Sequence, residues 1–181
     1  MIADIRLELV ATKGVRTKKA FQFLIAMVCS WEVEVTDVRK IDTQRLRCWE
    51  KLVSIWGAFR TSDKSGIPPN RMRWTPEGLQ GDITLTKTTG SGKRVGCLKF
   101  AISVNAWFIA TNWLRTGWEL FQKYSTERSF FLPLPSKDFM SYGTHEPSYV
   151  QQVAMEKKLC VRVPFARIWL TTMIPGSSRG S

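Results

Sequence analysis

The chain has 181 residues, 44% of them hydrophobic, which is enough for one folded domain with a buried core. Its 27 Lys and Arg residues against 15 Asp and Glu residues give a net charge of +12, with a pI near 9.9. Because Lys and Arg are rarely buried unpaired, the folded surface carries a positive field. The composition excludes a disordered chain and favours nucleic acid over an acidic membrane surface as the partner.

Residue types that support metal and nucleophile chemistry are scarce. His145 is the single histidine, and Cys29, Cys48, Cys97 and Cys160 are far apart and form no CxxC pair. Zinc sites and Ser or Cys nucleophile systems depend on His or clustered Cys. We therefore expect no metal, no small-molecule cofactor and no such hydrolase, and reduced thiols in an intracellular protein.

The N-terminal part of the chain predicts a helical segment over residues 1–40. Its longest apolar stretch, residues 20–31, is too short to span a bilayer and reads as a buried helix. No small-residue cleavage site follows an apolar region here, so we expect no secretory signal and no membrane partner. Residues 32–40 alternate like a strand but fit a loop between helices equally well.

Residues 42–59 have the clearest helical pattern in the chain. Asp42 or Thr43 can cap the N-terminus of this helix. Apolar side chains then recur at helical spacing at Leu46, Trp49, Leu52, Val53, Trp56 and Phe59. The pattern predicts a helix with one face on the core, which ends around residues 60–64, before the breaker run GIPPN at residues 66–70.

The next part of the chain predicts a β-hairpin. Residues 82–86 alternate like a strand, residues 88–92 have the composition of a loop, and residues 94–98 can return as a second strand. Lys87 and Lys93 then flank the tip of the hairpin.

The remaining pattern is again mainly helical. Ser103 can cap a helix over residues 104–124, and Trp107, Thr111, Leu114, Trp118 and Phe121 share one face of it. Two prolines make residues 130–135 an extended connector, a last helix is expected over residues 148–158, and residues 171–181 should be disordered. We expect an α+β fold, mainly helical, with a small antiparallel β-hairpin or three-stranded sheet.

One arrangement indicates chemistry on a phosphodiester. Arg60 lies at the expected end of the helix that begins at Asp42, and Lys87 follows 27 residues later in the hairpin. A guanidinium can bind the non-bridging oxygens of a phosphate bidentately, and an ammonium can protonate a leaving 5′ oxygen. In isolation, Arg60 reads as a partner of the helix dipole, and Lys87 and Lys93 read as solvated charges.

These residues resemble the tyrosine recombinases, which include phage integrases and the recombinases of mobile elements. The run LVSIWGAFRTSD (residues 52–63) is similar to the family's helix end, and ITLTKTTGSGKRV (residues 83–95) is similar to its catalytic hairpin. The resemblance covers roughly residues 43–100. It implies that Arg60 is the first catalytic arginine, Asp63 its acidic support and Lys87 the catalytic lysine.

The same resemblance implies a set of DNA-binding residues. Lys93 is a second candidate for the catalytic lysine, and Arg94 follows it. Arg71 and Arg73 lie in the run RMRW, which is similar to the segment that links the two motifs. We expect Lys93, Arg94, Arg71 and Arg73 to contact DNA.

The later family motifs do not follow in this chain. Family members have a His-x-x-Arg pair and then a nucleophilic tyrosine, whereas no arginine lies three residues after His145. Tyr142 and Tyr149 precede Arg162 and Arg167, which is the wrong order. We therefore expect residues 41–170 to form a partial catalytic domain, truncated and catalytically incompetent alone.

The function implied by the resemblance is DNA recombination or integration, as part of a mobile element. The partner is then DNA, on which the chain can assemble as a homo-oligomer, in the nucleus if the source is eukaryotic. The alternative is a non-catalytic basic nucleic-acid-binding module. In that case many Lys and Arg residues share the binding, with no privileged pair.

Overall fold

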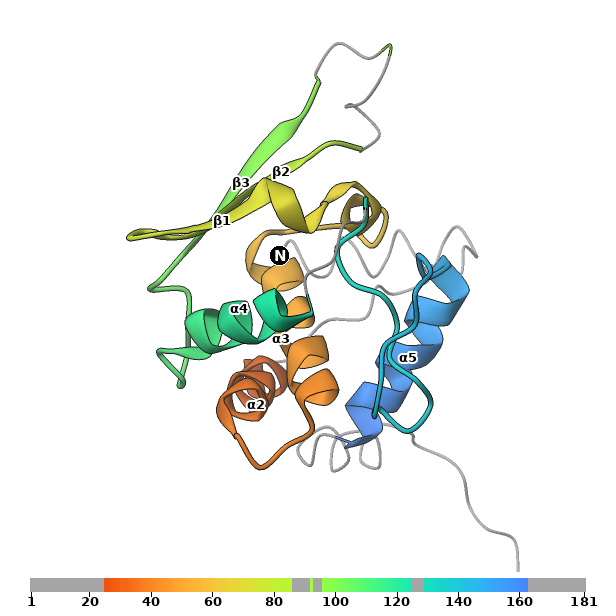
Figure 1. The fold of residues 1–181 in the computed structure, drawn as a ribbon. Helices are drawn as coiled ribbons and strands as arrows, with labels where there is room; N and C mark the ends of the chain where they lie inside the picture. Colours follow the sequence, from red (N-terminus) through yellow and green to blue (C-terminus); the bar gives the residue numbers. More distant parts are fainter. Residues whose placement is uncertain (1–24, 86–91, 93–95, 125–128, 163–181) are drawn as a thin grey trace, which may run out of the picture.

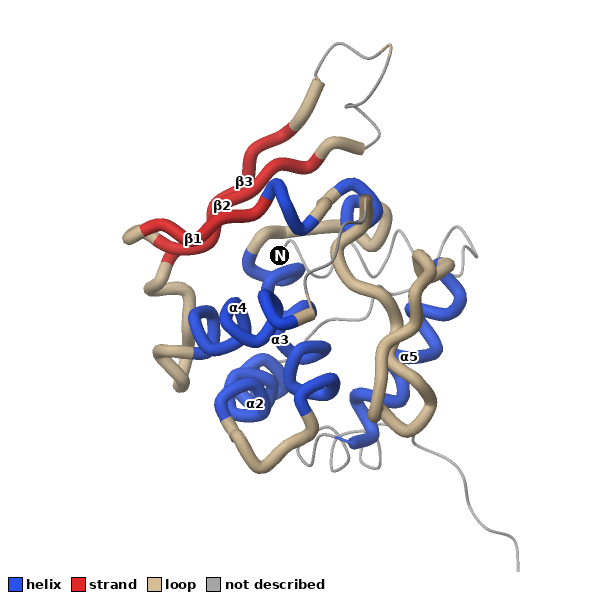
Figure 2. The backbone as a smooth tube through the Cα atoms, in the orientation of Figure 1, coloured by secondary structure: helices blue, strands red, loops and turns tan. Residues whose placement is uncertain are grey.

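The computed structural model describes residues 25–85, 92, 96–124 and 129–162. The described helices are α2 (Ile25–Thr36), α3 (Asp42–Trp56), α4 (Trp113–Lys123) and α5 (Tyr149–Arg162). The described strands are β1 (Met72–Thr75), β2 (Gly78–Ile83) and β3 (Leu98–Ser103), and the 3-10 turns η1 (Asp63–Gly66) and η2 (Pro69–Arg71) precede them. The expected α+β fold, mainly helical with a small antiparallel sheet, is confirmed (Figures 1 and 2). The predicted disordered tail lies outside the described residues.

The three strands form one antiparallel sheet in the order β1-β2-β3. Side chains alternate between its faces, because successive residues of a strand point to opposite sides. The buried, inner face is formed by Met72, Leu79, Ile83, Phe100 and Ile102. Figure 1 shows the sheet above the helices, and no described element covers its outer face.

Helix α3 is the centre of the core, and α2 and α4 pack against it. The Trp49 ring of α3 contacts Phe121 at 5.1 Å and Phe131 at 5.7 Å between centroids, and its Nε1 donates to the Leu114 carbonyl at 3.1 Å. A Cβ at Gly117 would lie 1.9 Å from this ring. A glycine therefore lets α4 approach α3 closely at this point.

Several boundaries in the first half differ from the prediction, and one is the end of α3, which lies at Trp56 and not around residues 60–64. Residues 32–36, left open between strand and loop, continue α2 to Thr36. Neither Asp42 nor Thr43 caps α3, which was predicted wrongly: Ile41 is the N-cap residue and gives no side-chain bond. The Thr43 hydroxyl instead donates to the Phe139 carbonyl, 96 residues away, so a tertiary contact replaces the local one. The predicted domain boundary at residue 40 falls in the loop between α2 and α3, and both helices contribute to one core.

The predicted helix over residues 104–124 is wrong in its first half, because β3 continues to Ser103 and α4 begins at Trp113. The buried carboxylate of Glu32 explains the loop between them. It accepts the backbone N–H groups of Phe108, Ile109 and Ala110 at 2.9–3.1 Å. These N–H groups thus have hydrogen-bond acceptors without forming a helix. Trp107, which was predicted on the core face of that helix, is 39% exposed.

β2 and β3 form a hairpin, but its paired strands are not those predicted: they span residues 78–83 and 98–103, and residues 84–85 and 96–97 of the predicted strands are not in strand. Ile83 is opposite Leu98, and Gly78 is opposite Ser103. The connection that contains Lys87 lies outside the described residues, apart from residue 92 and the ends of the connection. No described helix is both long and apolar enough to cross a membrane.

Candidate functional site

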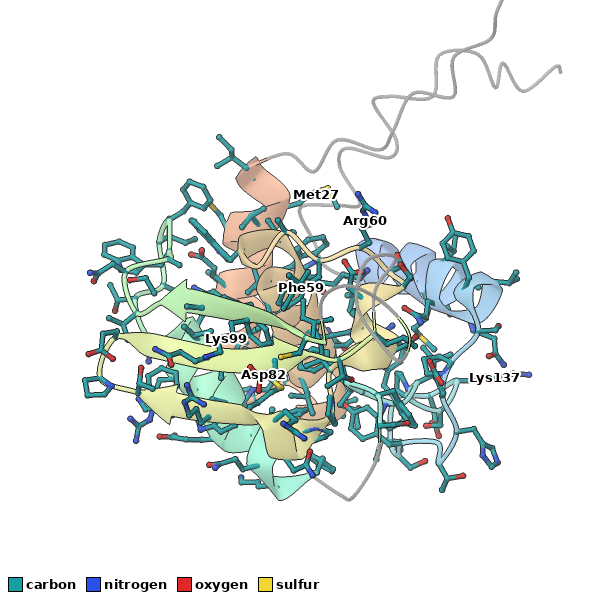
Figure 3. The ribbon with its side chains drawn as sticks, turned by 90° about the horizontal axis from the view of Figure 1, so that it is seen from above. Met27, Phe59, Arg60, Asp82, Lys99 and Lys137 are labelled. Carbon is teal, nitrogen blue, oxygen red and sulfur yellow. The ribbon has the colours of Figure 1, made fainter. Side chains whose placement is uncertain are left out.

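The C-terminal end of α3 determines where Arg60 lies. The Phe59 N–H donates to the Ser54 carbonyl at 2.8 Å, and the Ala58 N–H donates to the Ile55 carbonyl at 3.1 Å, the two bonds of a Schellman motif. Ala58 has φ +53°, in the left-handed region that this motif requires. The chain therefore turns sharply away from the helix, and Arg60 is exposed on the loop that follows (Figure 3).

Asp63 holds the backbone of Arg60 in place. Its Oδ2 accepts the Arg60 backbone N–H at 2.8 Å, and the Asp63 N–H donates to the Arg60 carbonyl at 3.0 Å. Among the described residues, no carboxylate pairs with the Arg60 guanidinium. The acidic residue thus orders the loop and leaves the cation available for an anion from outside.

The loop that contains Arg60 is bound to β3 through aromatic rings. Phe59 contacts Phe100 of β3 edge to face, with 4.8 Å between ring centroids. Phe59 also covers Gly57, where a Cβ would lie 2.5 Å from the ring. The residue before Arg60 is therefore fixed on the inner face of the sheet.

The same loop also contacts the end of β2, through Gly66, which lies six residues after Arg60. The backbone N–H of Thr84 donates to the Gly66 carbonyl at 2.7 Å, and the Thr84 hydroxyl donates to the same oxygen at 3.0 Å. A Cβ at Gly66 would lie 2.5 Å from the Leu85 nitrogen, so the two backbones are in close contact. Residues 57–66 thus contact both strands of the hairpin.

A buried ion cluster holds this loop against α3. The Lys64 ammonium lies 2.8 Å from Oε1 of Glu50, and Arg47 pairs with Oε2 of the same carboxylate. Burial alone raises the pKa of the Glu50 carboxyl, but the charges of Arg47, Lys64 and Lys51 outweigh it and lower the pKa from 4.5 to about 2. Glu50 is therefore ionised and ties η1 to α3.

The cavity beside this cluster is small. Glu50, Lys64 and the buried Gln152 of α5 line it together with Phe131 and Pro147, among others, and its volume is about 10 Å³. A space of this size holds about one water molecule. The cluster is thus a structural element of the loop, and a nucleotide does not fit there.

Sequence reasoning missed the role of Lys64, because a lysine next to Asp63 normally belongs to the solvated surface. Its pairing with Glu50 spans 14 residues and has no local signature. The polar face of α3 offered an indirect signal, since Arg47 and Glu50 are three residues apart and face the same side of the helix.

The structure places Arg71 and Arg73 together on the exposed side of the sheet. Arg73 Nη2 donates to Oε1 of Gln80 at 3.0 Å, and Arg71 lies 4.0 Å from the Asp82 carboxylate. The predicted candidates Lys87, Lys93 and Arg94 lie outside the described residues. The convergence of Arg60, Asp63 and Lys87 therefore stays a prediction.

The tyrosines and the histidine of the C-terminal region lie in different surroundings. The Tyr142 hydroxyl donates to the Thr43 carbonyl at 3.2 Å, and its ring contacts Tyr124 at 5.2 Å between centroids. Tyr149, at the start of α5, and His145 are both exposed. Tyr142 thus has a structural role, whereas Tyr149 is accessible.

Comparison with known proteins adds no relative. No protein-family model matches the chain, and no curated protein matches its sequence. The likeness to tyrosine recombinases therefore depends on the sequence of the two runs at residues 52–63 and 83–95 and stays an expectation.

Proposed function

We propose that the chain binds DNA and acts in recombination or integration of DNA, with the end of α3 and the β2–β3 hairpin forming a site for one phosphate. The observation that supports this best is the attachment of residues 57–66 to both strands of the hairpin. Phe59 contacts Phe100 of β3, and Gly66 binds Thr84 after β2. These two contacts attach the loop after α3 to the base of the hairpin, which supports the proposal that the two recombinase-like runs act together.

We propose that Lys87 completes this phosphate site. Lys87 itself lies outside the described residues, and the proposal is supported by the junction two residues before it, where a Cβ at Gly66 would lie 2.5 Å from the Leu85 nitrogen. In the proposed arrangement the Lys87 side chain reaches the phosphate that Arg60 binds.

The proposed chemistry assigns a different task to each cation. The Arg60 guanidinium binds the non-bridging oxygens of the phosphodiester and stabilises the negative charge that develops there during attack. The Lys87 ammonium donates a proton to the leaving 5′ oxygen. Asp63 acts through the backbone of Arg60, by holding the loop in position.

Strand cleavage by this chain alone is not part of the proposal. In tyrosine recombinases a tyrosine oxygen attacks the phosphorus and forms a 3′-phosphotyrosyl link, with several cations around the phosphate. Here the Tyr142 hydroxyl is engaged by Thr43, and no arginine lies three residues after His145. We propose a DNA-binding member of this class of proteins that is catalytically incompetent by itself.

The proposal includes a location and an assembly. We propose that the chain works inside the cell, where its DNA partner is, and in the nucleus if the source is eukaryotic. Recombination joins two duplexes, so we propose that copies of the chain assemble as a homo-oligomer on DNA.

A double-mutant cycle on DNA binding tests the proposed phosphate site. Arg60→Ala, Lys87→Ala and the double variant are titrated against one duplex at fixed salt. If both cations hold one phosphate, the double variant loses less affinity than the sum of the single losses. The matched control pairs Arg60→Ala with Lys137→Ala, an exposed lysine on the loop before α5, and these losses should add.

Additive losses for Arg60 and Lys87 would favour the second candidate function, a non-catalytic basic module. The net charge of +12 by itself supports that candidate. Binding would then be shared among many cations, and each variant would weaken it by a similar amount.

A further inference from the structure

We infer that the outer face of the β1-β2-β3 sheet is a second contact surface for duplex DNA, with Arg73 and Lys99 at phosphates. The inference rests on the proposed function, because it assigns a further part of the molecule to the same partner. It concerns the face of the sheet opposite the helical core (Figure 1), and so opposite the inner face on which Phe59 contacts Phe100.

The outer face is polar and uncovered. The outward residues of the strands are Arg73, Thr75, Gly78, Gln80, Asp82, Lys99, Ala101 and Ser103. Figure 3 labels Asp82 and Lys99 on this face of the sheet. A sheet left bare on one side in this way offers a flat surface of polar and small side chains to a large partner.

The two cations lie on the outer strands of the sheet, on opposite sides of the central strand β2. Arg73 lies opposite Gln80, which lies opposite Ala101, while Lys99 lies opposite Asp82. Adjacent strands are ~4.8 Å apart and residues rise ~3.4 Å, which separates Arg73 from Lys99 by roughly 12 Å. This is about the width of the major groove, so both cations can meet phosphates of one duplex.

The charges on this face remain available to a ligand. The Arg73 guanidinium donates to the neutral Gln80 amide. Arg73 therefore keeps its full charge and has a fixed orientation. The Arg71 side chain is about 60% exposed, and its Nη1 lies 4.0 Å from Oδ2 of Asp82. At this distance and exposure to solvent the ion pair is weak. The face therefore has three cations, Arg71, Arg73 and Lys99, against the carboxylate of Asp82.

The side chains favour duplex DNA over other polyanionic or protein partners. Specific protein interfaces are centred on buried aromatic or large apolar residues, and the outward positions here offer Ala101 instead. Strands are known to enter the grooves of B-DNA, whereas the deep and narrow major groove of RNA duplexes excludes them. Gln80 also keeps its amide nitrogen as a donor that can face a base edge.

The salt dependence of binding tests this inference. Each phosphate contact that is lost should reduce the slope of log K against log salt by about 0.9. We expect this reduction for Arg73→Ala and for Lys99→Ala in the full chain, titrated with a duplex of about 20 base pairs. Lys137→Ala removes the same charge away from the sheet, as Figure 3 shows, and should leave the slope unchanged.

A variant that is expected to raise the affinity distinguishes a lost contact from misfolding. Asp82→Asn removes the negative charge of this face and should raise the affinity, which a damaged protein would not do. Equal slopes for Lys99→Ala, Arg73→Ala and Lys137→Ala would overturn the inference and leave the proposed function standing. Equal competition by duplex RNA would overturn the assignment to DNA. Absence of DNA binding by the unmodified chain would overturn both.

Discussion

The Lys64 ammonium lies 2.8 Å from the Glu50 carboxylate, and both side chains are buried. Lys64 directly follows Asp63, which accepts the Arg60 backbone N–H. The Lys64 carbonyl also accepts the Phe131 N–H at 2.9 Å. The loop that presents Arg60 is therefore fixed to α3 and to the segment before α5 by one residue.

This pair gives a prediction on stability. Glu50→Gln leaves the buried cations of Arg47 and Lys64 without their counter-charge and should lower the free energy of unfolding by ~3–5 kcal/mol. Lys64→Met should lower it less, because Glu50 keeps its pairing with Arg47. Urea unfolding of both variants measures the difference. A larger loss in Lys64→Met would contradict the assignment of Glu50 as the centre of the cluster.

The lowered pKa of Glu50 gives a prediction on pH. Its folded pKa is about 2 and its ordinary value is 4.5, so its contribution to stability is complete above about pH 4.5 and is lost as the pH falls toward 2. A shift of this size corresponds to ~3 kcal/mol. The unmodified chain should lose stability over this window in urea titrations, and Glu50→Gln should lose less. Asp37→Asn is the control, since the Arg39 hydrogen bond also lowers the Asp37 pKa to about 2, but on the surface.

The left-handed conformation of Ala58 predicts a stabilising substitution. An L-residue with a side chain costs about 1–2 kcal/mol at φ +53°, and glycine removes that cost while losing part of the gain to chain entropy. Ala58→Gly should therefore raise the free energy of unfolding by ~0.5–1 kcal/mol. Ala101→Gly, in the extended backbone of β3, should lower it instead. A loss of stability in Ala58→Gly would mean that the Schellman motif does not form.

The Glu32 carboxylate predicts a local effect in the loop after β3. Glu32→Ala removes the acceptor of three backbone N–H groups, and each unsatisfied group costs about 1–3 kcal/mol if it stays buried. The loop should open to hydrate them, so amide exchange at residues 108–110 should become much faster. Glu119→Ala, which breaks an exposed pair with Arg115, should change neither exchange nor stability measurably. Unchanged protection in Glu32→Ala would show that another group holds the loop.

The parts of the fold that were predictable have local causes. Helix α3 was predictable because its buried residues Leu46, Trp49 and Leu52 recur at helical spacing on the one face that packs in the core. The start of α4 was predicted wrongly because Glu32, 76 residues before Phe108, decides it. β1 was missed as a separate strand, since four residues are too few to show a period.

The candidate site was predictable to a similar degree. The Arg60 motif could be read from the sequence, because a helix end and an acidic residue three positions later are local features. The Glu50–Lys64 pair could not, because segments from the C-terminal half cover the polar side of α3 that amphipathicity would expose. The place of Lys99 on the outer face could not be predicted either, because it depends on the register in which β2 and β3 pair.

The last prediction concerns covalent chemistry on DNA. Cleavage needs a nucleophile in reach of the phosphate together with several cations, and such groups lose nearly all activity when one is missing. The Tyr142 hydroxyl donates to the Thr43 carbonyl and its ring packs on Tyr124, which holds it away from an attacking role. We therefore expect no covalent adduct with nicked suicide duplexes on denaturing gels, at protein concentrations where the same duplexes are bound. Tyr149 is exposed at the start of α5 and is the accessible alternative. An adduct that disappears in Tyr149→Phe and persists in Tyr142→Phe would contradict the expectation and identify Tyr149 as a nucleophile.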